Sequence, residues 1–140
     1  MSTVNIKVAI DDIFAAIKAG TLKPEGNTVK ATDDFITYTS KTNTIDTSTT
    51  PPTITLVTND TVDFEIVPEN YNGEEVDFDY FDDPYLTAKP DNVAKHIDRY
   101  ETADTASKCK DITMKIHVSH DNAAWEINWD PTIIVGDPKK

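Results

Sequence analysis

The stretch WEINWDPTIIV, residues 125–135, indicates the fold class of this chain more clearly than any other segment. Its first half alternates Trp125, Ile127 and Trp129 with polar residues, and a period of two places the apolar side chains on one face of a β-strand. Asp130-Pro131 interrupts the pattern, because proline has no N–H for a strand ladder and restricts the residue before it. We therefore expect the chain to bend here and to begin a new strand at residues 132–135.

Alternation of the same kind predicts further strands along the chain. They are expected at residues 4–10, 35–39, 53–58, 62–67, 76–81 and 112–119. Residues 62–67 and 76–81 flank a turn at 68–73, which predicts an antiparallel pair with its acids on the outer face. After the first strand, Asp11-Asp12 provides an N-cap and Gly20 a C-cap, so we expect a helix of about two turns.

Two segments show weaker patterns. Residues 21–61 are rich in threonine, and within them residues 41–52 are interpreted as a polar loop. Residues 82–110 lack strand alternation and are interpreted as a long excursion, with a weakly helical pattern at 92–100 and His96 on its surface. The prediction is a mainly β protein, an antiparallel β-sandwich of about seven strands with a short helix after the first strand and a long loop or short helix before the last strands. With 140 residues, it should be a single domain, 1–140.

Composition excludes several classes of protein. The formal net charge is −12, from 25 acids and 13 bases, which argues against binding to nucleic acid or to an anionic membrane. No apolar run approaches the roughly 20 residues of a transmembrane helix, and the first residues do not read as a signal peptide, so we expect a cytoplasmic protein. The single cysteine, Cys109, cannot form an intrachain disulfide and is interpreted as a structural or surface thiol.

Acidic residues are densest around the predicted strand pair at 62–67 and 76–81. They are Asp63, Glu65, Asp77, Asp79, Asp82 and Asp83. Calcium could relieve their mutual repulsion, since it takes six to eight oxygen ligands, but the spacing of an EF-hand loop is absent. A solvated acidic face is therefore the preferred interpretation, with these acids as candidate metal ligands, and no cofactor is predicted.

No catalytic constellation is evident. Ser119-His120-Asp121 contains the residue types of a serine triad, but catalytic triads are assembled from separated positions. His117 and His120 with Asp121 lack the further ligands of a transition-metal site. We therefore expect no enzyme activity. Aromatic side chains beside polar groups could instead form a platform for a sugar, and the candidates are Tyr71, Tyr80, Phe81 and Tyr85.

Three segments carry a resemblance to a known family. They are the opening Val-x-Ile-x-Val-x-Ile-Asp strand at residues 4–11, the middle strand at 60–64, and the closing aromatic strand that continues into residues 129–135. Together they resemble the bacterial inclusion body protein family, to which PixA and AidA belong. The resemblance implies a compact β-sandwich, cytoplasmic expression tied to population density or host association, and no established enzyme activity. The inclusion-forming members are rich in methionine, whereas this chain has 2.

Two classes of function follow from these observations. The first is a non-enzymatic protein of the inclusion body type, which acts through accumulation or protein interaction. The alternative is a carbohydrate- or cation-binding β-sandwich module. The corresponding partners are a second copy of the chain, or a sugar or cationic partner. The two classes are distinguished by whether the candidate aromatic side chains lie outside the core.

Overall fold

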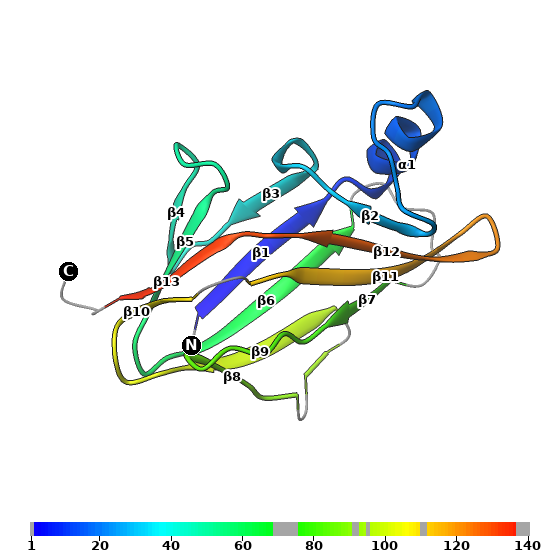
Figure 1. The fold of residues 1–140 in the computed structure, drawn as a ribbon. Helices are drawn as coiled ribbons and strands as arrows, with labels where there is room; N and C mark the ends of the chain where they lie inside the picture. Colours follow the sequence, from blue (N-terminus) through cyan, green and yellow to red (C-terminus); the bar gives the residue numbers. More distant parts are fainter. Residues whose placement is uncertain (1, 69–75, 91–92, 95, 110–111, 137–140) are drawn as a thin grey trace.

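The computed structural model describes residues 2–68, 76–90, 93–94, 96–109 and 112–136 (Figure 1). Within them the chain forms one α-helix, α1 (Ile10–Ala19), and a 3-10 turn, η1 (Asp33–Phe35). The strands are β1 (Ser2–Val8), β2 (Thr28–Lys30), β3 (Ile36–Thr39), β4 (Thr44–Asp46), β5 (Thr53–Val57), β6 (Thr61–Pro68), β7 (Val76–Asp79), β8 (Leu86–Ala88), β9 (Ile97–Thr102), β10 (Ser107–Cys109), β11 (Met114–His120), β12 (Ala123–Trp129) and β13 (Thr132–Gly136).

The strands form three open sheets that mix parallel and antiparallel pairs. One sheet has the order β3-β1-β6-β9-β8, and the other two have the orders β10-β13-β5-β4 and β2-β12-β11-β7. The prediction of a mainly β protein is confirmed, but a simple antiparallel sandwich of about seven strands is wrong. Three pairs, β1 with β6, β2 with β12 and β5 with β13, are parallel. Parallel neighbours need crossover connections, and strand alternation does not show which strands these connections bring together.

The two four-stranded sheets form one layer that divides at Asp130-Pro131. β12 ends at Trp129 and pairs with β11, whereas β13 begins at Thr132 and pairs with β10. In Figure 1 the two strands form one band that crosses in front of β1 and β6 of the five-stranded sheet. The predicted interruption and restart at Asp130-Pro131 is therefore confirmed.

A single apolar cluster lies between the layers and joins all three sheets. Alternation predicts that eight side chains face the core, and seven of them are buried: Ile6, Val8, Phe64, Ile66, Ile116, Ile127 and Trp129. Trp125 is partly buried and packs against the edge of this cluster. The closing stretch thus contributes one fully enclosed indole and one indole at the margin.

The helix begins earlier than the sequence predicts. Ala9 is the N-cap and makes no side-chain capping hydrogen bond, so Asp11 and Asp12 lie in the first turn rather than at the cap. Acids in the first turn still interact favourably with the helix dipole. Gly20 caps the other end with a φ of 79°, as predicted, and its N–H donates to the Ile17 carbonyl. Among the described residues no helix has the length and apolar character to cross a membrane.

Three further predictions require correction. β6 and β7 are not a pair: β6 lies between β1 and β9, and β7 is hydrogen-bonded to β11. The excursion at residues 82–110, expected to lack strands, contains β8, β9 and β10, and β9 begins within the part expected to be weakly helical. The segment expected to be a polar loop contains β4. Residues 69–73 of the predicted turn lie outside the described residues.

Candidate functional site

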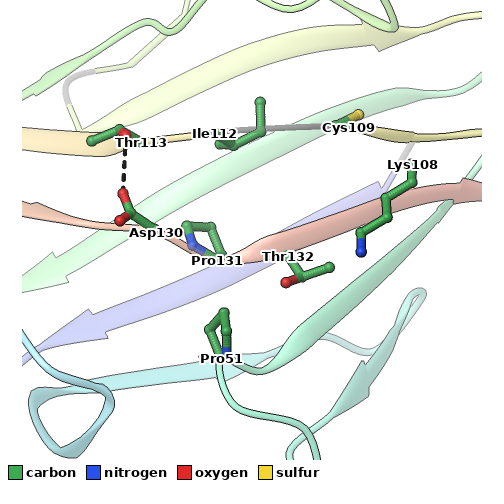
Figure 2. Close-up of a pocket in the computed structure, with 8 residues that line it drawn as sticks. All are labelled: Pro51, Lys108, Cys109, Ile112, Thr113, Asp130, Pro131 and Thr132. Carbon is green, nitrogen blue, oxygen red and sulfur yellow. Dashed lines mark hydrogen bonds between the residues drawn. The ribbon is translucent and has the colours of Figure 1, made fainter.

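The strongest candidate site is a pocket where the outer layer divides (Figure 2). Because Pro131 cannot continue the ladder between β12 and β11, the strands separate beside it. The pocket has a volume of about 380 Å³. Its lining residues are Pro51, Lys108, Cys109, Ile112, Thr113, Asp130, Pro131 and Thr132.

Asp130 occupies the wall of this pocket with both carboxylate oxygens engaged. Thr113 Oγ1 donates a hydrogen bond to Oδ1 at 2.9 Å, and Lys30 Nζ lies 2.7 Å from Oδ2. The hydrogen bond to Asp130 raises the pKa of Lys30 above its usual value, and the opposite charge raises it further. Asp130 therefore fixes β2 and the segment before β11 against the β12–β13 junction.

A second cavity, of about 360 Å³, lies on the other side of the same junction and shares Pro51 and Asp130 with the first. Tyr38 is buried near this side, and burial raises the pKa of its hydroxyl, with further contributions from Asp33 and Asp130. The phenol is thus held in its neutral form. The division of the layer therefore opens small spaces on both sides of Asp130-Pro131.

The thiol of Cys109 is unsuited to nucleophilic chemistry. Its side chain is buried, and burial raises its pKa to about 12, with Asp83 adding to the shift. Thiolates, rather than thiols, are the nucleophiles and metal ligands. The structure therefore agrees with the interpretation of Cys109 as a structural residue. Besides Asp130 and Thr113, the pocket offers the Lys108 ammonium and the Thr132 hydroxyl as polar groups.

The candidate metal ligands do not converge. Asp63 is buried on β6 and forms a bidentate pair with Arg99, at 2.7 Å from Nε to Oδ1 and 3.0 Å from Nη2 to Oδ2. Glu65 is on the same strand, whereas Asp77 and Asp79 are on β7 of another sheet, and Asp79 Oδ2 lies 2.6 Å from His117 Nε2.

Asp82 is exposed, and Asp83 Oδ1 accepts the Tyr85 N–H at 2.8 Å. Within the described part of the chain, no group of three or more His, Cys, Asp or Glu side chains is placed to hold a metal ion. The sequence places these acids close together, but the fold distributes them over two sheets and a loop.

The candidate aromatic side chains that the structure describes are partly buried and pack against the core. Phe81 stacks on Tyr100, with ring centroids 4.4 Å apart, and its N–H donates to the Tyr100 hydroxyl at 2.8 Å. In return, the N–H of Arg99 donates to the Tyr80 hydroxyl at 3.1 Å. Tyr85 also packs against the core, and Tyr71 lies outside the described residues. These reciprocal bonds fasten the segment after β7 to β9.

Ser119 and His120 are consecutive residues of β11, so their side chains point to opposite faces of the sheet. His120 stacks on Phe14 of α1, with ring centroids 3.8 Å apart, and its Nε2 lies 3.4 Å from Asp121 Oδ2. Asp121 and Asn122 have φ of 49° and 61°, as in a two-residue hairpin turn. His120 therefore joins the β11–β12 hairpin to the helix.

Sequence reasoning located the break at Asp130-Pro131 but not the pocket beside it. Lys108, Thr113 and Pro51 come from three separated segments, and no local pattern indicates that they meet. It also missed Asp98, which is 3% exposed on β9, because an acid is expected to face water.

No protein-family model and no curated protein matches the sequence. Comparison of the fold with solved structures finds the crystal structure of an inclusion body protein (PixA) from Burkholderia cenocepacia J2315. The TM-score is 0.54 with 8% sequence identity, and the match covers 96% of this chain and 94% of that chain. The chain therefore shares an inclusion body protein's fold at a distance that leaves its activity open.

Proposed function

We propose that this chain is a non-enzymatic bacterial protein of the inclusion body type, which acts in the cytoplasm through accumulation or protein interaction. The observation that carries the proposal is the likeness to the PixA inclusion body protein along nearly the whole of both chains. The likeness agrees with the resemblance in the sequence. Two of the three segments that carry the resemblance lie in β1 and β6, which are parallel neighbours in the five-stranded sheet. The third segment lies in the β12–β13 band.

The side chains that carry chemistry support this choice over an enzyme. Cys109 is held as a thiol, Asp130 is bonded on both oxygens, and His120 is stacked on Phe14. A hydrolase of the serine type needs a nucleophile hydrogen-bonded to a base that a third group orients. Instead, Asp130 bonds Thr113 and Lys30, and His120 lies against a core aromatic ring.

The alternative, a carbohydrate-binding module, has less support. A sugar site needs aromatic faces turned outward beside polar groups. Here the rings of Tyr80 and Phe81 lie against Tyr100, and the Tyr80 hydroxyl accepts a backbone N–H.

Expression in a bacterium tests the proposal directly. We expect electron-dense bodies in the cytoplasm, from which mild buffer releases folded protein with its native tryptophan fluorescence. The destabilised variant Trp129→Ala is the control for misfolded aggregates, since its bodies should dissolve only in denaturant. A chain that stays dispersed at every expression level, or a glycan array that gives specific binding, would contradict the proposal.

A further inference from the structure

The outer face of the sheet β10-β13-β5-β4 is almost free of charge. Its outward side chains are Thr44, Thr53, Thr55, Val57, Thr132 and Ile134, with Asp46 and Lys108 at its two edges. By contrast, the outer face of the sheet β2-β12-β11-β7 carries Lys30, Asp77, Asp79, Lys115 and Glu126, together with His117. On a chain with a net charge of −12, an uncharged β-branched face calls for an explanation.

The charges at the edges of this face are opposite in sign and lie on opposite edge strands. Asp46 is on β4, where Oδ1 accepts the N–H and hydroxyl of Ser48, at 2.9 and 2.6 Å. These bonds lower the pKa of Asp46, so that it remains a carboxylate. Lys108 is exposed on β10, and no acid among the described residues lies within ion-pair distance of it. Each edge therefore presents one charge to a partner.

We propose that this face binds the same face of a second copy of the chain around a two-fold axis. The axis runs parallel to the strands, midway between the two facing sheets and level with the gap between β5 and β13. It therefore reverses the strand order of the second copy. β4 of one copy then lies over β10 of the other, and β5 lies over β13. A two-fold interface of this kind uses the same patch on both subunits.

The register of the sheet fits this symmetry. Thr44, Thr55, Ile134 and Lys108 are successive partners in one row across the four strands. Reversal of the row places Thr55 of each copy opposite Ile134 of the other. Asp46 is displaced from that row by two residues, or roughly 7 Å along the strand, a gap that the flexible stem of Lys108 bridges. The two-fold therefore forms two Asp46–Lys108 pairs at the edges of an uncharged centre.

The size of the face determines the strength of the contact. Two strands of five residues and two of three, about 4.8 Å apart and with about 3.3 Å per residue, give a footprint of roughly 250 Å². A standard stable interface buries roughly 800 Å² on each partner. The contact is therefore weak and reversible, and it is populated when the chain is concentrated, as it is in the accumulation that we propose above, on which this inference rests.

Sedimentation equilibrium of the purified chain, from micromolar to millimolar concentration at physiological ionic strength, tests the interface. We expect a monomer–dimer equilibrium. The change Ile134→Lys should raise the dissociation constant more than roughly tenfold, because it places two ammonium groups in the uncharged centre. Its melting temperature checks that the variant is folded. A chain that is monomeric throughout, or a dimer indifferent to Ile134→Lys in the folded state, overturns the proposal.

Charge exchange tests the two-fold register. Asp46→Lys and Lys108→Asp should each weaken the dimer, and the double variant should restore it, since the pair is re-formed with its signs reversed. Asp77→Lys and Lys115→Asp are the matched controls, because they make the same changes in net charge on the other sheet face. Failure of the double variant to recover beyond these controls overturns the register.

The two proposals fail separately. Cytoplasmic bodies formed by a chain that is strictly monomeric in solution would overturn this interface and leave the proposed function standing. A dimer that depends on Ile134, formed by a chain that never accumulates in cells, would support the interface and overturn the proposed function.

Discussion

Replacement of Asp98 by asparagine should make the protein more stable at alkaline pH and somewhat less stable in acid. Asp98 faces the core from β9, its side chain is 3% exposed, and Oδ2 has no hydrogen-bond partner among the described residues. Burial raises the pKa of this carboxyl to about 7, and the negative charge of Asp79 adds to the shift. In the unfolded chain an aspartate titrates near 3.9.

The sign of the effect follows from proton linkage. Between pH of about 4 and about 7 the folded protein holds a proton that the unfolded chain has released, so stability falls as pH rises through this window. Each pKa unit corresponds to 1.36 kcal/mol, and a shift of roughly 3 units amounts to about 4 kcal/mol above neutral pH. The asparagine side chain cannot ionise, although its buried amide costs about 1–3 kcal/mol if it also lacks partners. The expected net gain at pH 8 is therefore about 1–3 kcal/mol.

Urea unfolding of parent and variant at pH 5 and pH 8 measures this difference. The other acids are present in both proteins. The unfolding free energy of the variant minus that of the parent, compared between pH 5 and pH 8, therefore reports on Asp98. Asp77→Asn, on an exposed side chain of β7, is the matched control and should show no such change. A free-energy difference between Asp98→Asn and its parent that is the same at both pH values would refute the reasoning, because the carboxyl would then titrate alike in the folded and unfolded chains.

Three further predictions concern the core, the thiol and the acids. Trp129→Ala should cost about 3–5 kcal/mol in urea unfolding, because Trp129 is 2% exposed, and a variant that melts within a degree or two of its parent would contradict its place in the core. Cys109 should resist alkylation at pH 8 in the folded protein and react once urea unfolds it, since its pKa is raised to about 12; rapid labelling of the native chain would show an accessible thiolate. Micromolar calcium should raise the melting temperature no more than sodium at matched ionic strength, because Asp63 is bonded to Arg99 while Asp77 and Asp79 lie on another sheet.

Strand alternation predicted the parts of the fold in which one face is apolar and the other polar. It located most of β1, β6, β11 and β12, and the break at Asp130-Pro131, because each of these strands places apolar side chains against the core. It failed at β9, where Asp98, Tyr100 and Thr102 face inward. An acid at a core position removes the apolar alternation that marks a strand, so the segment was predicted to be weakly helical.

Pairing between strands was beyond the reach of the sequence. The parallel partners of β1, β12 and β13 come from distant segments, and the pocket beside Asp130 depends on those partners. The six acids that lie close together in sequence were predicted to share a face, yet β6 and β7 belong to different sheets. Local periodicity determines which face of a strand is buried, whereas long-range packing determines which strands become neighbours.

The edges of the three sheets bear on how this chain can accumulate. Edge strands expose unpaired N–H and C=O groups, and another chain can add a strand to them. In the described sheets the edge strands are β3, β8, β4, β10, β2 and β7, and each is only three or four residues long. Such short edges offer few backbone groups to a second copy. Accumulation of the folded chain should therefore proceed through side-chain contacts between faces, for which the uncharged outer face of β10-β13-β5-β4 is the best suited.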